Sequence, residues 1–334
     1  MSQDALLLVE GLKVIFPTDA GIIKAVEGID LAIHPGECLA LVGESGCGKS
    51  VSSLAILGLL GTPPALVRAQ TIRFDGQNLQ ALNEQQMAQI RGKDIAMIFQ
   101  DALTALNPVM SIGRQLDEVF LKHCGMNKNQ AKEASIEALR AVGVSSPAQR
   151  YRQFPHQLSG GMRQRVLIAM AFAASPKLII ADEPTTALDV TIQMQVLEEL
   201  RAMQRKSGTA LMLITHDLSV VNYLADRILV MYSGKIVETG PVKQILKQPA
   251  HPYTEGLLTS VPRLDTCNTR FYQIPDQVPN PMNKPSGCHF HPRCSHAGEL
   301  CKQTVPSLRS LSPQREVRCH FPLQKGEGGD SQHA

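Results

Sequence analysis

The sequence has no apolar stretch long enough to cross a membrane. Its longest uninterrupted apolar run covers only residues 166–174, whereas a membrane-spanning helix needs about 20 residues. The start of the chain also lacks a basic segment followed by an apolar one, because Asp4 and Glu10 lie there. We therefore expect no secretory signal and no membrane span, and a cytosolic, reducing setting.

A strong excess of charge of either sign is also missing. The 33 Lys and Arg residues and the 30 Asp and Glu residues leave a net charge of +3, too little to indicate a surface that binds nucleic acid. We find no internal repeat. A length of 334 residues allows about two domains with a sizeable core.

The sequence has an α/β pattern over most of its length. Short apolar runs alternate with amphipathic stretches over residues 6–242, which is typical of α/β units around a mostly parallel sheet. Strand-like runs disappear between residues 101 and 157, so we expect a helical insertion there, with its clearest helix at 131–142. The strands that we expect are 38–42, 94–99, 178–181, 210–215 and 227–232.

The composition changes after Gly240. Frequent prolines exclude long regular elements in the rest of the chain. We therefore divide the chain into 1–242, a loop-rich module at 243–324, and a polar, Gly-rich tail at 325–334 that we expect to be disordered.

Residues 43–50 have the composition of a phosphate-binding loop. They follow an apolar strand and precede a predicted helix at 51–60, which is the context that such a loop requires. Glycines let backbone N–H groups turn toward phosphate, and the helix N-terminus adds partial positive charge. Lys49 is placed to reach the β- and γ-phosphates and Ser50 to hold Mg²⁺. The residues expected to bind the nucleotide are Gly43, Glu44, Ser45, Gly46, Cys47, Gly48, Lys49 and Ser50.

Two adjacent carboxylates end the apolar strand at 178–181. Asp182 suits Mg²⁺, directly or through water, and Glu183 suits the general base that polarises an attacking water. Adjacent carboxylates at a strand end are often only solvated, so this interpretation depends on the phosphate-binding loop earlier in the chain.

The segment Leu158-Ser159-Gly160-Gly161-Met162 precedes a predicted helix, so it offers a second helix N-terminus that can bind an anion. One nucleotide does not need two such loops in the same subunit. Here the sequence resembles the ATP-binding-cassette family, in which this signature loop closes over ATP held by the other subunit of a dimer. Met162 departs from the family pattern, which usually has Gln at this position.

The resemblance covers residues 6–242 and implies roles for further residues. By it, Gln100 senses Mg²⁺ and the lytic water, His216 contacts the γ-phosphate, and Phe16 stacks on adenine. The segment Ala187-Leu188-Asp189 matches the loop that crosses the dimer interface. The implied fold is an α/β P-loop cassette with a mixed parallel core sheet, an antiparallel β subdomain and a helical subdomain. The implied activity is ATP hydrolysis coupled to dimer closure.

The sequence also resembles one subfamily, the ATPases of dipeptide, oligopeptide and nickel importers. The segments that carry this resemblance are His251-Pro252-Tyr253-Thr254, Thr104-Ala105-Leu106-Asn107-Pro108 and residues 181–191. It implies a peripheral protein on the cytoplasmic face of the inner membrane. The implied partners are two membrane permeases, a second ATPase subunit and, indirectly, an extracytoplasmic substrate-binding protein. The alternative is a soluble cassette protein of translation or DNA repair, but such proteins usually carry two cassettes or a long coiled coil.

The C-terminal region contains four of the eight cysteines in the pattern Cys288-x5-Cys294-x6-Cys301-x17-Cys319. Four thiols in a segment too poor in apolar residues for its own core suggest a metal staple. Cys₄ ligation fits either Zn²⁺ or a [4Fe–4S] cluster. The spacings are wide for zinc, and the subfamily resemblance implies the cluster. Neighbouring His residues are alternative zinc ligands, unligated thiols remain a third possibility, and Cys267 stays unassigned.

Overall fold

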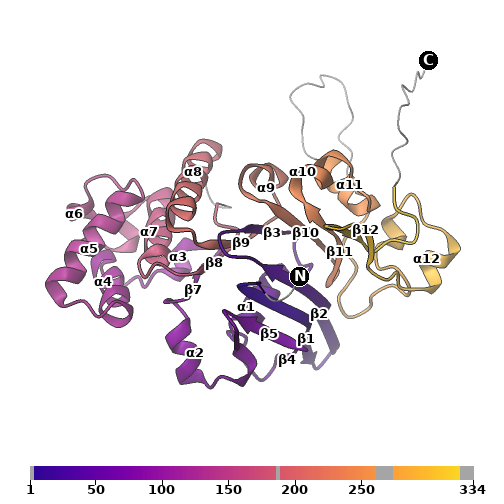
Figure 1. The fold of residues 1–334 in the computed structure, drawn as a ribbon, viewed down its shortest axis with the longest axis horizontal. Helices are drawn as coiled ribbons and strands as arrows, with labels where there is room; N and C mark the ends of the chain where they lie inside the picture. The colour runs from indigo at the N-terminus through magenta and orange to yellow at the C-terminus, as the bar shows by residue number, and fades with distance from the viewer. Residues whose placement is uncertain (1–3, 186–188, 261–273, 324–334) are drawn as a thin grey trace, which may run out of the picture.

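The computed structural model describes residues 4–185, 189–260 and 274–323, which form two sheets with surrounding helices (Figure 1). The core sheet has eight strands in the order β12-β13-β11-β10-β3-β9-β8-β7. Its parallel strands are β3 (Cys38–Val42), β7 (Ile95–Ile98), β8 (Leu178–Asp182), β9 (Ala210–Thr215) and β10 (Arg227–Tyr232). These strands confirm the predicted ones to within a residue or two at each end.

The second sheet is antiparallel and is formed mainly by the N-terminal part of the chain. Its strands are β1 (Leu7–Thr18), β2 (Gly21–Ile33), β4 (Leu66–Arg68), β5 (Thr71–Phe74) and β6 (Gln77–Asn78). The short helices η1 (Leu79–Ala81) and α2 (Glu84–Ile90) follow it. This sheet is the antiparallel β subdomain that the family resemblance implies.

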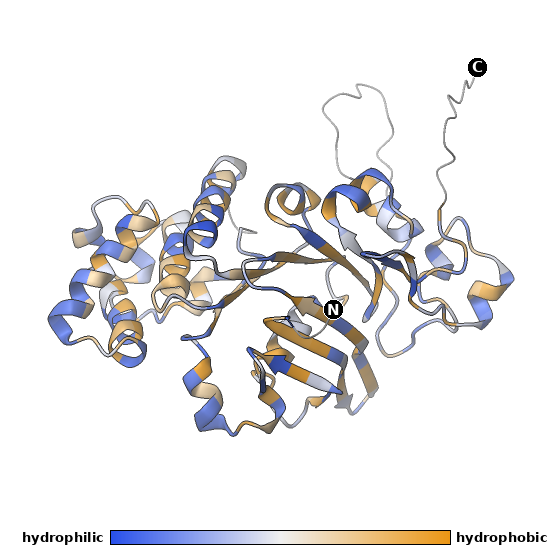
Figure 2. Ribbon diagram, viewed as in Figure 1, coloured by the Kyte–Doolittle hydropathy of each residue, from blue (hydrophilic) through white to orange (hydrophobic). Residues whose placement is uncertain are grey.

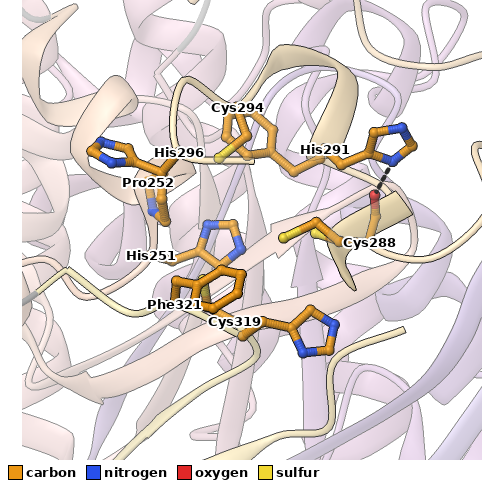
Figure 3. A pocket seen from close by; sticks show the side chains of 11 residues that line it. His251, Pro252, Cys288, His291, Cys294, His296, Cys319 and Phe321 are labelled. Atoms are coloured by element: carbon orange, nitrogen blue, oxygen red, sulfur yellow. Dashed lines mark hydrogen bonds between the residues drawn. The ribbon is translucent and has the colours of Figure 1, made fainter. Parts of the chain in front are cut away.

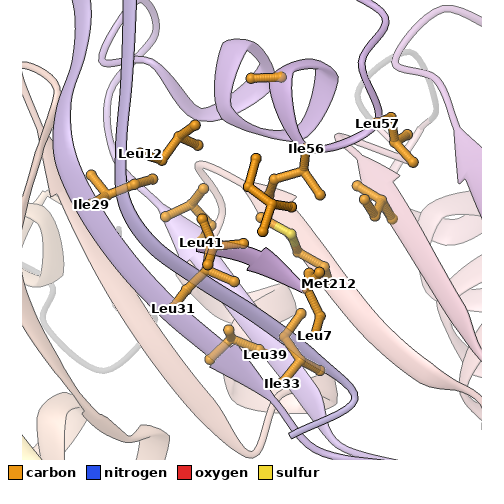
Figure 4. Close-up of a cluster of buried hydrophobic side chains, with 14 of the residues drawn as sticks. Leu7, Leu12, Ile29, Leu31, Ile33, Leu39, Leu41, Ile56, Leu57 and Met212 are labelled. Carbon is orange, nitrogen blue, oxygen red and sulfur yellow. The ribbon is translucent and has the colours of Figure 1, made fainter. Parts of the chain in front are cut away.

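The apolar residues of the two sheets meet around α1 (Lys49–Ile56) and form one core. Leu7, Leu12 and Ile29 from the antiparallel sheet pack with Leu41 and Met212 from the core sheet, and all are almost fully buried. Figure 4 shows these side chains lying between the strands and the helix. Figure 2 shows the corresponding apolar colour along the central strands, with polar residues on the outer faces of the helices.

The helical insertion lies at one end of the molecule (Figure 1). It contains α3 (Ala102–Ala105), α4 (Ile112–His123), α5 (Lys128–Ala141), α6 (Pro147–Arg150) and η2 (Pro155–Gln157), and is followed by α7 (Gly160–Phe172). The predicted helix at 131–142 is part of α5. The helices α8 (Val190–Ser207) and α9 (Leu218–Leu224) cover the core sheet further along the chain. None of the helices in the described ranges combines the length and apolar character needed to span a bilayer.

Helix α1 ends earlier than the predicted range of 51–60. Gly58 adopts a left-handed φ of 62° directly after the capping residue Leu57. The N–H of Gly58 donates to Ala55 O at 3.1 Å and the N–H of Leu59 to Leu54 O at 2.8 Å. This hydrogen-bond pair is the glycine-dependent stop that closes many helices. Leu59 and Leu60 beyond this stop continue the apolar sequence pattern of the helix but lie outside its helical backbone.

The C-terminal region is joined to the core sheet. Its helices are α10 (Val242–Lys247), α11 (Pro252–Thr259), η3 (His291–Arg293) and α12 (Glu299–Gln303). Its strands β12 (Arg309–Ser312) and β13 (Arg315–Val317) extend the core sheet beyond β11 (Lys235–Pro241). Tyr253 and Phe290 pack against Tyr232 of β10 with ring centroids 4.6 and 5.2 Å away. The region therefore shares the core of the preceding part, and the division at residue 242 stays a prediction.

Candidate active site and cysteine pocket

The phosphate-binding segment 43–50 is the turn between β3 and α1. Gly43 is required there because a Cβ would lie 2.2 Å from the backbone oxygen of Met231. Lys49 is 5% exposed. Its Nζ donates to the carbonyl oxygens of Gly43 at 2.7 Å and Glu44 at 3.0 Å. The ammonium group thus lies across the loop beside the start of α1, an arrangement suited to phosphate.

The other predicted nucleotide residues differ in where they lie. Ser45 and Gly46 are exposed at the turn, and Gly48 caps α1. Cys47 is buried, and burial raises the pKa of its thiol. Phe16 is half-buried on β1 and packs against the core. Its contact with adenine stays a prediction.

Asp182 and Ser50 come together where β8 ends beside α1. The Ser50 side chain hydrogen-bonds the Asp182 carboxylate, while Asp182 Oδ1 is buried and has no hydrogen-bond partner within the described residues. Burial raises the pKa of Asp182, and the neighbouring Glu183 charge adds to the rise. A bare carboxylate oxygen beside a hydroxyl suits Mg²⁺, which is bound by one or two protein oxygens together with water and phosphate.

Glu183 lies between the two other predicted catalytic residues. Its Oε2 accepts from Gln100 Nε2 at 3.1 Å, and its Oε1 lies 3.1 Å from His216 Nδ1. The Glu183 side chain is 12% exposed and that of His216 is 59% exposed. Glu183 also has a left-handed φ of 46°, a conformation that costs about 1–3 kcal/mol and is concentrated at functional sites. Gln100 and His216, each at the end of a different strand, thus both contact the Glu183 carboxylate, which lies next to Asp182 and its candidate Mg²⁺ site.

The signature loop is placed elsewhere in the molecule. Ser159 caps α7 by accepting from the N–H of Met162 at 3.3 Å, and Ser159 and Gly160 are exposed while Gly161 is half-buried. Figure 1 shows α7 with the helical end, apart from α1. The signature loop and the phosphate-binding loop thus begin two different helices, α7 and α1, and the action of the signature loop on a second subunit stays a prediction.

The segment predicted to cross the dimer interface is described only at its last residue. Asp189 is exposed and caps α8 by accepting from the N–H of Ile192 at 3.0 Å. Residues 187 and 188 lie outside the described residues.

Cys288, Cys294, Cys301 and Cys319 line one pocket in the C-terminal region, which we call the four-cysteine pocket. Figure 3 shows it with its neighbours His251, His291 and His296. Burial raises the pKa of Cys288, Cys294 and Cys319, in the last case to about 11, and nearby thiols add to each rise. Across the described ranges, no three side chains of the metal-binding types are placed to hold a metal ion. The four predicted ligands thus share one pocket, but their binding of a metal stays a prediction. Cys267 lies outside the described residues.

Two residues to which the sequence assigns no role at the nucleotide site contact the phosphate-binding loop. The Tyr253 hydroxyl accepts a hydrogen bond from the N–H of Glu44 at 2.9 Å. The guanidinium of Arg293 donates to both carboxylate oxygens of Glu44, at 2.8 and 3.0 Å. Arg293 and Glu44 are 249 positions apart, and no local pattern in the sequence indicates that they pair.

Comparison with known proteins agrees with this geometry. The family described as ABC transporter matches residues 26–186, and the family described as oligopeptide/dipeptide transporter, C-terminal region, matches residues 237–301. The dipeptide transport ATP-binding protein DppD of Escherichia coli is 46% identical over 319 residues, covering 96% of this chain and 97% of that protein. The oligopeptide transport ATP-binding protein AppD of Bacillus subtilis is 46% identical over 324 residues, covering 97% and 99%.

Solved structures give the same result for the cassette. A dimeric ATP-binding cassette in a post-hydrolysis state with ADP and Pi superposes with a TM-score of 0.63 at 25% identity, covering 71% of this chain and 98% of that chain. The CbiO1 protein of Clostridium perfringens, part of an ABC transporter complex, superposes with a TM-score of 0.62 at 26% identity, covering 73% and 92%. The phosphate-binding loop, the paired carboxylates and the separate signature loop thus occur in a chain that belongs to the ATP-binding-cassette family, as an ATPase of its oligopeptide and dipeptide transporter group.

Proposed function

We propose that this chain powers the import of peptides as a peripheral subunit on the cytoplasmic face of the inner membrane. The observation that carries the proposal is the combination of a cassette ATPase site with the C-terminal region of peptide transporters, since the relatives named for dipeptide and oligopeptide transport match both parts together. Two membrane permeases and a second ATPase subunit are the proposed partners. A substrate-binding protein outside the membrane would act through the permeases.

In the proposed mechanism, ATP and Mg²⁺ bind at the phosphate-binding loop. Lys49 leaves the carbonyl oxygens of its own loop to bind phosphate, and Ser50 and Asp182 hold the metal ion, which stabilises charge on the transferred phosphoryl group. Glu183 accepts a proton from the attacking water. Gln100 and His216 hold the carboxylate from opposite sides, one oxygen each. Ser159 and Gly161 would complete the site of the partner subunit.

Closure of the two subunits then determines when hydrolysis occurs. Hydrolysis needs positioned groups more than covalent chemistry, and this chain alone lacks the second loop at its own site. Opening after hydrolysis would return the permeases to their starting state. The soluble alternative in translation or DNA repair gains no support, because the C-terminal match is to transporters.

Transport is the direct test. The chain is co-expressed with the proposed permeases and second ATPase, and the complex is reconstituted in proteoliposomes with its binding protein. We expect ATP-dependent uptake of a labelled dipeptide or pentapeptide, lost with Lys49→Ala. ATP hydrolysis without uptake of either peptide, in a complex that assembles, would contradict the peptide assignment while leaving the ATPase intact.

We further propose that the four-cysteine pocket holds a [4Fe–4S] cluster. Two observations support the proposal. Four thiols line one pocket, and burial together with the neighbouring thiols raises the pKa of three of them, an effect that bound cations would oppose. Both a zinc ion and a cluster take four thiolates; the wide spacing of these cysteines in the sequence and the resemblance to the importer subfamily favour the cluster. The cluster would cross-link a segment with little apolar core of its own.

The test is the iron, zinc and acid-labile sulfide content of chain purified without oxygen. About four iron and four sulfide per chain are expected, lost in Cys294→Ser and kept in Cys124→Ser, the matched control at an exposed cysteine outside the pocket. One zinc without sulfide, or no metal at all, would contradict the cluster.

A further inference from the structure

The first residues of the phosphate-binding loop are held by side chains from the C-terminal region. Glu44 is contacted at two places: its N–H donates to the Tyr253 hydroxyl at 2.9 Å, and its carboxylate is gripped by both terminal nitrogens of Arg293. The N–H and the carboxylate of Glu44 are therefore both engaged by side chains of the C-terminal region. Glu44 thus attaches the loop to a part of the chain more than 200 residues away.

Both gripping side chains are themselves fixed. Arg293 is 4% exposed, and its remaining donors bond Pro275 O at 2.7 Å, Asp276 O at 3.1 Å and the Tyr232 hydroxyl at 3.4 Å. Tyr253 is fully buried. Because the Glu44 side chain is 29% exposed, the loop is the less constrained partner in this contact. The C-terminal region therefore positions the loop rather than the reverse.

The same elements build the four-cysteine pocket. Arg293 ends η3 and is followed directly by Cys294, and the N–H of His291, the first residue of η3, donates to Cys288 O at 3.0 Å. Phe290 lines the pocket and packs on Tyr253 with ring centroids 5.3 Å apart. A change in the pocket that moves η3 would therefore move the guanidinium that holds Glu44.

The charge of Glu44 gives this contact a consequence for ATP. A carboxylate at the start of a phosphate-binding loop repels a polyphosphate through a partly desolvated environment. Arg293 neutralises it, and the fork geometry of the pair also fixes where the carboxylate lies.

We propose that Arg293 and Tyr253 are positioning residues for ATP binding: they hold and neutralise Glu44, and so couple the phosphate-binding loop to the four-cysteine pocket. The proposal depends on ATP binding by this loop and is independent of which solute is transported and of which metal, if any, the pocket contains.

The first experiment measures ATP affinity and the kinetics of hydrolysis in the full chain within its assembled complex. Arg293→Met is expected to raise the Kd of a fluorescent ATP analogue and the KM for ATP by roughly tenfold, with a much smaller change in kcat. High salt should reduce the effect because it screens the exposed charge. Adding Glu44→Gln to Arg293→Met should restore most of the affinity, since the repelling charge is gone.

A merely structural role of the pair predicts a different result. In that case Glu44→Gln would not rescue Arg293→Met, and the loss would not depend on salt. Tyr253→Phe keeps the buried ring and removes only the acceptor for the Glu44 N–H, so it tests the proposal even if Arg293→Met fails to fold. An ATP Kd within twofold of wild type in Tyr253→Phe would overturn the proposal, and so would a folded Arg293→Met variant that Glu44→Gln does not rescue.

Reciprocity gives an independent readout, because ATP must affect the pocket as much as the pocket affects ATP. Hydrogen exchange of the peptide covering 288–303 is expected to slow when ATP is added to wild type. The slowing should be lost in Tyr253→Phe combined with Glu44→Gln, while the hairpin at 71–78 serves as the control. An unchanged rate of hydrogen exchange at 288–303 when ATP is added to wild type would refute the coupling.

Discussion

Replacing Glu183 with Gln tests the proposed general base at the point where the site is best defined. Gln keeps the shape of the side chain, so its oxygen can still accept from Gln100 and its amide nitrogen can still face His216 Nδ1, the two contacts now made at 3.1 Å each. Proton transfer to the side chain is lost. General bases contribute about 10²–10⁴-fold to rate, which corresponds to about 3–5 kcal/mol at 1.36 kcal/mol per tenfold. We therefore expect kcat to fall by 10²–10⁴-fold while ATP still binds and the dimer still closes.

The assay is phosphate release by the assembled complex, with nucleotide affinity measured on the same preparation. Glu137→Gln is the matched control, because this carboxylate is 65% exposed on α5 and lies in a surface ion pair with Arg140. It should leave kcat unchanged. A Glu183→Gln complex that binds ATP and hydrolyses it within threefold of wild type would refute the assignment of Glu183 as the base.

Three further predictions concern stability and the loop. Glu238 is fully buried and accepts hydrogen bonds from the N–H groups of Ala250 and His251 and from Arg315. Glu238→Ala should therefore lower the free energy of unfolding by about 3–5 kcal/mol in denaturant titrations, unlike Glu137→Ala; equal unfolding midpoints for the two variants would contradict this. Burial lowers the pKa of His251 to about 3, so between that pH and about 6.5 only the unfolded chain binds this proton. The free energy of unfolding should therefore decrease as the pH drops below about 6.5, by up to ~1.4 kcal/mol per pH unit. His251→Asn keeps an acceptor for the Tyr253 N–H and should lose this pH dependence; the same pH dependence in wild type and variant would argue against the prediction. Gly43→Ala should abolish nucleotide binding because its Cβ would overlap Met231 O. Gly76→Ala should bind nucleotide normally, since its Cβ meets no atom within 4 Å and the left-handed φ of 80° strains only the turn between β5 and β6; retained binding in Gly43→Ala would show that the backbone can shift.

The parts of the fold that the sequence predicted are those with strong local patterns. Strands β8 and β9 are buried along their whole length, so they appear as continuous apolar runs whatever surrounds them. The phosphate-binding loop depends on glycines and on a lysine at fixed offsets, which are visible without a structure. The predicted end of a helix was wrong where a single residue determines it, as at Gly58, which ends α1 before the apolar pattern of the sequence ends.

The missed features all depend on contacts between distant segments. Strand β12 exposes most of its residues and has the polar sequence Arg309–Ser312, so its strand conformation results from pairing with β13 and not from an apolar pattern. Arg293 has cysteines and histidines among its neighbours in the sequence and no acidic residue within five positions to suggest an ion pair. Its partner becomes apparent only once η3 is folded against the phosphate-binding loop.

These distant contacts share one arrangement, in which acids before residue 242 pair with cations after it. Glu27 pairs with Lys284 at 2.6 Å, Glu44 with Arg293 at 2.8 Å and Glu238 with Arg315 at 2.8 Å. In each pair at least one partner is largely buried. Such pairs add little net stability compared with apolar contacts, but separating the partners leaves a buried charge unpaired and is strongly unfavourable. An apolar interface formed by Tyr253 and Phe290 alone would tolerate small shifts, whereas the ion pairs penalise any shift that separates a partner. We infer that the C-terminal region is held in one orientation on the cassette, and that this fixed orientation is what allows Arg293 to position a loop so far away in the sequence.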